Sequence, residues 1–346
     1  MENAALHQPQ SAAGRITSGE YLGAEAALHF GDPVAELAAL RESWGAFRLR
    51  WRAKITVTGK DRVRWLHNMV TNNVRDLALN RGNYNFVLNA QGRILGDMYI
   101  YNRGESLVLD TDSTQVEPLL TSMKRYIIMD KVEMDVTPII AFGICGPKSV
   151  EKLAAAGFDV QGMEPLEIRE VRSGHLLARG PLAKPGWYEL WSILNDDSGA
   201  AVVPGWAGGQ MAGTQALEYW RILHGIPQYG QDIRDRDLPQ ETGQTQALNF
   251  NKGCYIGQEI VERIRSRGQV HRKFTGFEFA DGLPALGKYE SEGRALAEVT
   301  SVAAVPTSTG ERNIGLGYIR REAAEAGPQI ELHGRKAKLV ELPFAE

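Results

Sequence analysis

Hydrophobic positions in the first part of the chain follow two different periods. Between residues 34 and 44, and again between 63 and 70, apolar side chains recur every three or four residues, which is the spacing of one helix face. Asp32-Pro33, before the first of these segments, is a helix-start signal. Shorter apolar runs bounded by turn formers are typical of strands. We predict strands at 54–57, 84–88, 94–101 and 106–109, then a helix at 115–126 and a strand at 132–136.

The same order of elements recurs in the next part of the chain. We predict a strand at 139–144, a helix at 147–156, strands at 166–171, 176–178 and 187–194, and a helix at 209–223. Two successive units of strand, helix, strands and helix are typical of ferredoxin-like α+β subdomains. No sequence identity links the two units, so we predict a repeat of topology only.

Beyond residue 226 the pattern changes twice. Residues 226–251 are irregular and include alternating charges from Asp232 to Asp237, which is typical of a solvated loop; alternatively, residues 231–238 hold a protein partner. A loop and then a helix follow around residues 252–264. After residue 267, short strand-like runs divided by glycines predict a small β-barrel. We therefore predict a disordered tail at 1–20, a domain of two α+β subdomains at 21–267, and a C-terminal β-barrel domain at 268–346.

Composition agrees with a globular protein that has more than one core. The 346 residues are 43% hydrophobic and 23% charged, and a chain of this length exceeds a single ordinary core. A net charge of -3 argues against a nucleic-acid surface spread over the whole protein. No secretory signal, no apolar run of roughly 18 residues and no CxxC pair is visible. We expect a cytoplasmic monomer with reduced thiols, no direct nucleic-acid partner and no membrane contact.

Cys254 is the first candidate for chemistry. It follows Lys252-Gly253, and apolar residues from Ile256 onward have helical spacing, which predicts a loop that enters a helix at or just after the cysteine. A helix N-terminus contributes roughly 0.3 to 1 kcal/mol to an anion, so it lowers a thiol pKa by less than about one unit, and Lys252 would supply the rest. The alternative is an unreactive, buried cysteine.

Asp97 is the second candidate. It lies early in a predicted strand whose Met98 and Ile100 share an apolar face, and its carboxylate could anchor ring N–H groups of a ligand or steady a cationic centre. The alternative is an exposed turn carboxylate. No phosphate-binding glycine loop and no HxxxH or HxH spacing is present, so a resident metal is not expected.

These features together resemble a known family. Residues 252–259, Lys-Gly-Cys-Tyr-Ile-Gly-Gln-Glu, resemble the K-G-C-Y-x-G-Q-E signature of the YgfZ-type folate-binding proteins, which are paralogues of the glycine-cleavage T-protein, an aminomethyltransferase. Residues 55–61, 221–233, 238–241 and 297–301 resemble further family segments. The resemblance implies a ring of folate-binding subdomains plus a barrel, with tetrahydrofolate or a C1-substituted form as cofactor. It also implies a role in making or maintaining iron-sulfur proteins, including tRNA-modifying enzymes.

Two departures separate this chain from the T-protein pattern. Gly96 stands where the T-protein has the first acid of an acidic pair that ends at Asp97. In residues 181–189, Pro185 takes the place of a glutamate that contacts the pterin, and a proline side chain accepts no hydrogen bond. Aminomethyl transfer by the T-protein mechanism is therefore disfavoured, and folate would use other contacts.

We expect the functional residues to fall into two groups. Those expected to perform chemistry are Cys254, Lys252 and Asp97. Those expected to bind the cofactor are Asp97, Glu189, Arg221, Tyr229, Tyr255 and Gln258.

Three hypotheses follow from the sequence. The first is a tetrahydrofolate-binding accessory protein for iron-sulfur cluster assembly or repair, with Cys254 as the working thiol and iron-sulfur client or assembly proteins as partners. The second is a tetrahydrofolate-dependent aminomethyltransferase, or another C1 transferase or demethylase. The third is a binding module without chemistry, which holds a protein partner.

Overall fold

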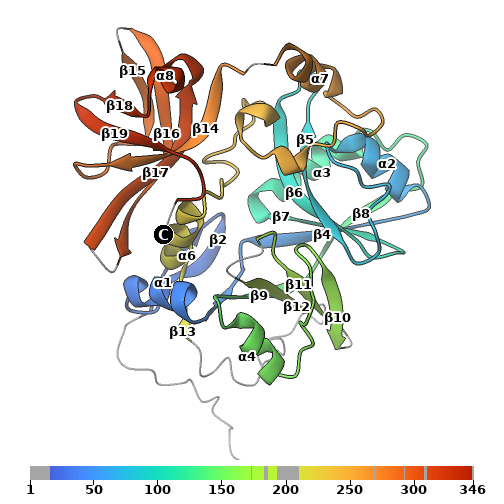
Figure 1. Cartoon of the computed structure of the whole chain (residues 1–346). Coiled ribbons are helices and arrows are strands. Elements are labelled where there is room, and N and C mark those ends of the chain that lie inside the picture. The colour runs from blue at the N-terminus through green and yellow to red at the C-terminus, as the bar shows by residue number, and fades with distance from the viewer. Residues whose placement is uncertain are drawn as a thin grey trace, which may run out of the picture. The chain divides into compact units, whose positions relative to one another are not determined.

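The computed structural model describes residues 16–172, 174–182, 186–192, 210–268, 270–291, 293–307 and 310–344. The chain forms two compact units, and the first combines Met1–Ala53 with Thr137–Leu217. The second combines Lys54–Val136 with Glu218–Glu346. Each unit is therefore built from two separated stretches of sequence, whose elements are labelled in Figure 1.

The first unit is built around a six-stranded sheet of order β10-β11-β12-β9-β3-β13. Its strands are β3 (Gly45–Arg48), β9 (Ile140–Cys145), β10 (Ile168–Arg172), β11 (His175–Arg179), β12 (Trp187–Ser192) and β13 (Gln210–Met211). Neighbouring strands are antiparallel except β3 and β13. Helix α4 (Ser149–Ala155) follows β9, and Leu153 packs with Ile144 and Leu190 in the core of the unit.

The N-terminal elements of this unit begin earlier than expected. Strand β1 (Thr17–Tyr21) pairs with β2 (Ala24–His29), so residues 17–20 are part of a hairpin rather than of the predicted tail. Residues 1–15 lie outside the described residues. Helix α1 (Pro33–Glu42) starts as the Asp32-Pro33 signal predicts, because the Asp32 carboxylate accepts hydrogen bonds from two backbone amides of the first turn.

The second unit contains a five-stranded sheet of order β5-β6-β7-β4-β8. Its elements are β4 (Arg52–Thr58), α2 (Arg62–Met69), β5 (Gly82–Leu88), β6 (Ile94–Asn102), β7 (Leu107–Asp112), the 3₁₀ turn η1 (Ser113–Gln115), α3 (Val116–Lys124) and β8 (Glu133–Thr137). All the predicted strands and both predicted helices of this region are confirmed. Met98 and Ile100 of β6 are buried, while Asp97 and Tyr99 on the opposite face are only partly covered.

A connecting segment leads from the first unit to the C-terminal strands. It contains α6 (Thr214–Leu223), the 3₁₀ turns η3 (Pro239–Glu241) and η4 (Thr245–Ala247), and α7 (Gln258–Arg267). Helix α6 begins later than the predicted residue 209, because residues 210–211 form β13. Helix α7 ends at Gly268, whose left-handed φ of 77° suits a glycine at a helix end.

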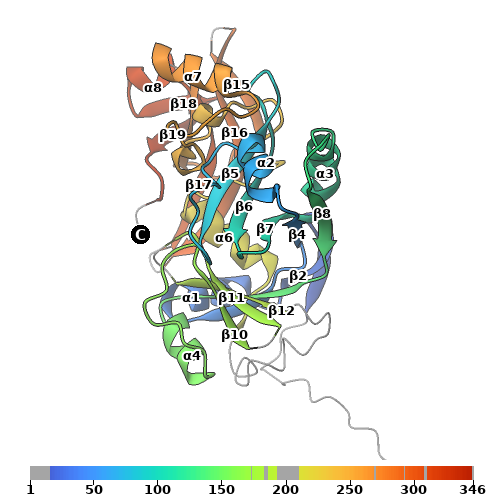
Figure 2. The same cartoon turned by 90° about the vertical axis from the view of Figure 1, so that its right-hand side faces the viewer.

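The C-terminal strands form an open sheet, so the predicted β-barrel is wrong in its closure. The sheet has the order β15-β16-β17-β14-β19-β18, and it curls into a half-barrel (Figure 1; Figure 2). Its elements are β14 (Arg272–Phe279), β15 (Gly287–Ser291), β16 (Arg294–Thr307), β17 (Gly310–Arg320), α8 (Arg321–Ala326), β18 (Gln329–Leu332) and β19 (Arg335–Val340). A register shift between Val299 and Ser301 adds twist, but among the described residues β15 and β18 remain unpaired edges.

No described helix is long and apolar enough to cross a membrane.

A buried ion pair links two strands of the second unit and gives a test of its packing. Lys54 Nζ lies 2.6 Å from Asp110 Oδ1, and the two side chains are 1% and 3% exposed. Lys54→Met should lower the free energy of unfolding by about 3–5 kcal/mol, because it leaves a buried carboxylate without its cation. Lys54→Met combined with Asp110→Leu should recover most of that loss. Urea unfolding measures both, and an equal loss in the single and double variants would contradict this account.

Candidate functional site

Cys254 lies on a surface loop before α7. It is exposed, whereas Cys145 is fully buried, so Cys254 is not the buried, unreactive cysteine of the alternative interpretation. Helix α7 begins at Gln258 after Gly257, which has a left-handed φ of 83°. Cys254 therefore precedes the helix by a full turn, and the expected position at its N-terminus is wrong. A helix dipole acts mainly within the first turn of its helix, and Cys254 lies outside that turn of α7.

Lys252 holds this loop against the end of α2. Its ammonium is buried and donates to the carbonyls of His67 and Val70, both at 2.5 Å, and of Asn72 at 2.8 Å. Carbonyl groups at a helix end lack partners within the helix, and Lys252 satisfies them. All three N–H bonds of the ammonium are thus in use. The structure gives Lys252 an anchoring role, and its tuning of the Cys254 thiol stays a prediction.

Two opposing effects act on the charge of Lys252. Burial, followed by the charge of Arg75, lowers the pKa of Lys252 to about 7. The three carbonyl oxygens favour the charged ammonium, because a neutral amine has only two N–H bonds. The ammonium also lies 4.9 Å from the centre of the Tyr255 ring, which fixes the next part of the loop.

Asp97 is held by two donors on β5 and before α3. Its Oδ2 accepts from the Tyr84 hydroxyl at 2.5 Å, and its Oδ1 accepts from Gln115 Nε2 at 2.8 Å. The Asp97 backbone amide donates to Gln115 Oε1 at 2.9 Å, so the two residues are joined twice. Asp97 is partly buried and fixed in orientation. The alternative of an exposed turn carboxylate is therefore wrong.

Aromatic residues surround this carboxylate. The Tyr84 and Tyr99 rings lie 5.0 Å apart, and the Tyr229 hydroxyl donates to the Leu95 carbonyl at 2.9 Å. Burial raises the pKa of Tyr229, and the Asp97 charge raises it further. Tyr255 packs into the same hydrophobic cluster as Tyr84 and Tyr229. We call Asp97, Tyr84, Tyr99, Tyr229 and Tyr255 the Asp97 cluster.

The structure thus brings together Asp97, Tyr229 and Tyr255, which we predicted from separate segments. Cys254 adjoins the Asp97 cluster directly through Tyr255 in the sequence. Sequence reasoning missed Tyr84, Tyr99 and Gln115. Tyr84 pairs with Tyr99 across the β5–β6 hairpin, and this pairing is the signal that could have identified both tyrosines. A register shift beside Leu88 means that the pairing cannot be found by counting residues from the turn.

The remaining predicted cofactor-binding residues have other contacts. Gln258 Oε1 accepts from the Tyr255 amide at 3.3 Å and thus braces the loop. Arg221 is buried and binds Asp232 and Ser301 at 2.8 and 2.9 Å, so it fastens α6 to a loop and to β16. Glu189 lies in the first unit, where it accepts from the indole N–H groups of Trp187 and Trp191 at 3.0 and 2.9 Å.

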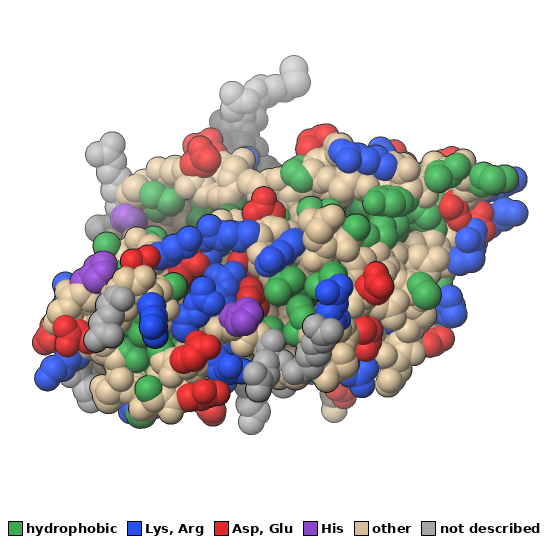
Figure 3. Space-filling model, turned by 90° about the horizontal axis from the view of Figure 1, so that it is seen from above, with side chains coloured by type: hydrophobic (Ala, Val, Ile, Leu, Met, Phe, Trp, Pro, Cys, Tyr) green, Lys and Arg blue, Asp and Glu red, His purple; other side chains and the backbone are tan. Residues whose placement is uncertain are grey.

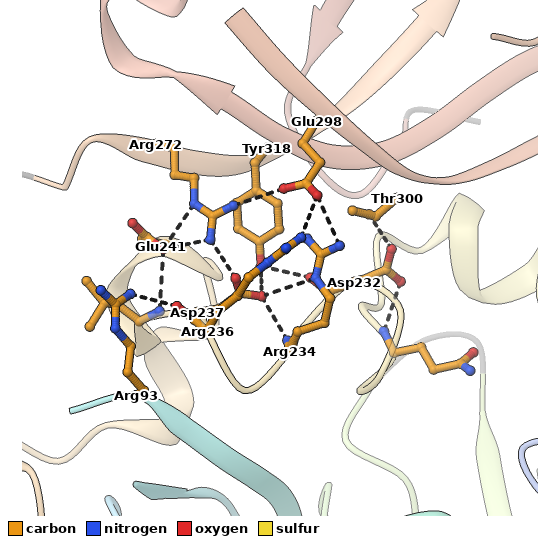
Figure 4. Close-up of polar contacts among 12 residues, drawn as sticks. Arg93, Asp232, Arg234, Arg236, Asp237, Glu241, Arg272, Glu298, Thr300 and Tyr318 are labelled. Carbon is orange, nitrogen blue, oxygen red and sulfur yellow. Dashed lines mark hydrogen bonds and ion pairs between the residues drawn. The ribbon is translucent and has the colours of Figure 1, made fainter. Parts of the chain in front are cut away.

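The charged loop after α6 is only in part the solvated loop that we predicted, because Asp235 and Arg236 are exposed and two other aspartates are buried. Asp232 and Asp237 are 0% exposed. Asp232 accepts from Arg221, Thr300 and Ser301. Asp237 accepts from Arg272 at 2.5 Å and from Tyr318 at 3.3 Å (Figure 4). Asp232 and Asp237 therefore turn inward to an arginine and a hydroxyl, whereas Asp235 between them is exposed.

Two further observations limit the chemistry of the site. No group of three or more His, Cys, Asp or Glu residues that could hold a metal ion occurs in the described part of the chain. A Cβ on Gly96 would lie 2.7 Å from Leu119 Cδ2, so α3 occupies the space that an acidic side chain would need. Residues 183–185, which include the Pro185 of the sequence comparison, lie outside the described residues.

The fold is that of the glycine-cleavage T-protein. Residues 12–179 match the model of the GCVT N-terminal domain. The crystal structure of the glycine cleavage system aminomethyltransferase T from Bartonella henselae has a TM-score of 0.85 over 95% of this chain and 94% of that chain, at 19% identity. This likeness establishes the fold.

Proteins with two different names have sequences similar to this chain. The iron-sulfur cluster assembly factor IBA57 of Mus musculus is 31% identical over 324 residues, which cover 86% of this chain and 83% of that protein. An aminomethyltransferase of Thermoanaerobacter pseudethanolicus is 26% identical over 344 residues, which cover 93% and 91%. The chain belongs to the family of the iron-sulfur cluster assembly factor IBA57, and it has the fold of an aminomethyltransferase.

The anchoring role of Lys252 predicts a loss of stability when its charge is removed. Lys252→Met keeps the aliphatic stem but leaves three buried carbonyls without donors, and should lower the free energy of unfolding by about 2–4 kcal/mol. Lys273→Met, at an exposed lysine, should change it by less than about 0.5 kcal/mol. Equal urea unfolding midpoints for the two variants would rule out the anchor.

His67 at the end of α2 predicts a pH dependence of stability. Burial, then the charges of Lys252 and Arg75, lowers the pKa of His67 to about 4. The unfolded state, with a His pKa near about 6.5, binds more protons between those values, so stability falls as the pH falls through this window.

Between about pH 7.5 and about pH 4.5, the free energy of unfolding of the wild type should fall by roughly 2–3 kcal/mol more than that of His67→Asn. Asparagine keeps an acceptor for the Arg75 amide, which lies 3.3 Å from His67 Nδ1. Urea unfolding at several pH values gives the difference between the two proteins. A difference that stays constant with pH would show that His67 does not titrate in this way.

Proposed function

We propose that the protein is a tetrahydrofolate-binding accessory factor for iron-sulfur cluster assembly or repair, with Cys254 as its working thiol. The observation that carries the proposal is the position of Cys254: an exposed cysteine on an anchored loop, directly before a tyrosine of the Asp97 cluster. Similarity to the IBA57 assembly factors at 28–31% identity supports it.

The Asp97 cluster suits the pterin of a folate. Asp97 accepts hydrogen bonds from Tyr84 and Gln115, and a carboxylate held in this orientation is the type of acceptor that ring N–H groups of a pterin need. Tyr99 and Tyr229 are partly exposed and offer aromatic surface to a planar ring. The resemblance of residues 252–259 to the YgfZ-type signature supports a folate-binding paralogue that works in the cytoplasm. Tetrahydrofolate or a C1-substituted form would be the ligand.

The thiol would act together with another molecule. Cys254 alone supplies one sulfur, and no group of three or more His, Cys, Asp or Glu residues that could hold a metal ion occurs among the described residues. Any iron-sulfur cluster that Cys254 contacts is therefore shared with a client or assembly protein, or with a small thiol. Clients among tRNA-modifying enzymes remain part of the same proposal.

A second candidate function is a tetrahydrofolate-dependent aminomethyltransferase or another C1 transferase. The fixed orientation of Asp97 favours it, because a carboxylate in that position could steady a cationic centre on a folate. Relatives named aminomethyltransferase at 26–27% identity favour it as well. The packing of Gly96 against Leu119 weighs against it, because the chain has no room for the first acid of the T-protein pair. Production of methylene-tetrahydrofolate from an amine donor would favour this candidate over the first.

Calorimetry tests the folate site. Tetrahydrofolate should bind the wild-type protein, and Asp97→Asn should weaken binding by about 10-fold, because a charged acceptor of ring N–H groups becomes a neutral amide. Asp135→Asn, at an exposed aspartate of the same unit, should bind like wild type. No heat of binding at any concentration would remove folate from the proposal and leave a binding module for a protein partner.

Complementation tests the thiol. In cells that lack the protein, Cys254→Ala should fail to restore the activity of iron-sulfur enzymes while it binds tetrahydrofolate like wild type. Cys145→Ala serves as the control, because Cys145 is buried and its burial raises the pKa of its thiol. Restoration of activity by Cys254→Ala to the wild-type level would exclude a working role for this sulfur.

A further inference from the structure

A second hollow lies in the same unit, lined mainly by basic side chains. Its volume is about 490 Å³, which is within the range of small-molecule sites. The basic residues that line it are Arg93, Arg236, His271, Arg272, Lys288 and Arg320, and we call it the arginine cleft. Figure 3 shows basic side chains gathered on this face of the molecule, with acidic side chains at their margins.

Some of these charges are already matched. Arg272 binds Asp237, Glu241 and Glu298 at 2.5 to 3.1 Å (Figure 4). Arg236 and Arg234 bind Glu298 at 2.7 and 3.1 Å, so three arginines match three carboxylates. These carboxylates are committed to the arginines that fasten the loop to the sheet. They leave no negative charge for the other basic residues of the cleft.

Three cations of the cleft lack a carboxylate partner among the described residues. They are Arg93, Lys288 and Arg320. Arg93 donates to the Arg236 carbonyl at 2.6 Å, which orients its guanidinium but leaves its charge uncompensated. Glu290 is the one lining carboxylate outside the matched set, so three cations against one anion leave two positive charges.

Part of the cleft lining is apolar. Ala295 and Leu296 of β16 line it with apolar side chains, whereas Tyr318 is 1% exposed and lies beneath the Arg272 guanidinium, which is 4.2 Å from the ring centre. A bare inorganic ion would leave this apolar wall uncovered. An anion with a compact organic body would use both the wall and the charges.

We propose that the arginine cleft binds a small organic anion with two negative charges, held by Arg93, Arg320 and Lys288. Phosphate and carboxylate groups share the geometry that a guanidinium binds in a bidentate manner. The cleft is separate from the Asp97 cluster, because none of the residues that line the cleft belongs to that cluster. The inference is independent of the proposed function.

Two ligands with the same body and charge test the proposal. Phenyl phosphate and phthalate both carry a benzene ring and two negative charges, and differ in the anionic group. Calorimetry at low ionic strength should give saturable binding of one molecule per chain for at least one of them, and added salt should weaken it. Tighter binding of phenyl phosphate would assign a phosphate ester, and tighter binding of phthalate a dicarboxylate.

Variants locate the binding. Arg320→Gln combined with Lys288→Gln should weaken the preferred ligand by at least about 10-fold, because two charge-assisted contacts are lost. Its melting temperature should match that of wild type, because neither residue pairs with a carboxylate in the described structure. Lys273→Gln is the control, because Lys273 is exposed and follows Arg272 on the other face of β14.

Two outcomes would overturn the proposal. One is the absence of saturable binding of either ligand up to about 10 mM, which corresponds to a free energy weaker than about -2.7 kcal/mol. The other is equal affinity in wild type and in the double variant, which would place the ligand elsewhere on the protein.

Discussion

Two buried carboxylates, Asp232 and Asp237, hold the second unit of this protein together. Each accepts hydrogen bonds from an arginine and from a hydroxyl of the C-terminal sheet. A buried charge is stable only while its partners are in place, so the loop and the sheet must fold as one body. Two residues of this loop take part in the sites described above. Tyr229 lies in the Asp97 cluster, and Arg236 lines the arginine cleft, where it binds Glu298.

The Cys254 loop depends on a simpler device. One buried ammonium, that of Lys252, satisfies three carbonyls at and beyond the end of α2 and so fixes a loop that has no regular structure. The loop can then present an exposed thiol without losing its position. Anchoring by a lysine explains why a cation precedes the cysteine by two residues, although this cation does not reach the sulfur with a free N–H bond.

The sequence predicted the regular elements of the second unit well, because their burial follows the helix and strand periods. The alternation of β6, which places Met98 inward and Asp97 on the other face, is one example. Three features could not be predicted from periodicity. The closure of the C-terminal sheet depends on whether its two edge strands meet, and they do not. The burial of Asp232 depends on Thr300 and Ser301, which are distant in sequence.

The third feature is the Asp97 cluster itself. The strand pattern gave Asp97, and resemblance to a family gave Tyr229 and Tyr255. Tyr84 is placed beside them by the register of a hairpin, which a bulge shifts. The clearest test of the whole account joins the thiol to this cluster. Alkylation of Cys254 by iodoacetamide should be slowed by bound tetrahydrofolate, with buried Cys145 unreacted. An alkylation rate unchanged by saturating tetrahydrofolate would contradict a folate site beside the working thiol.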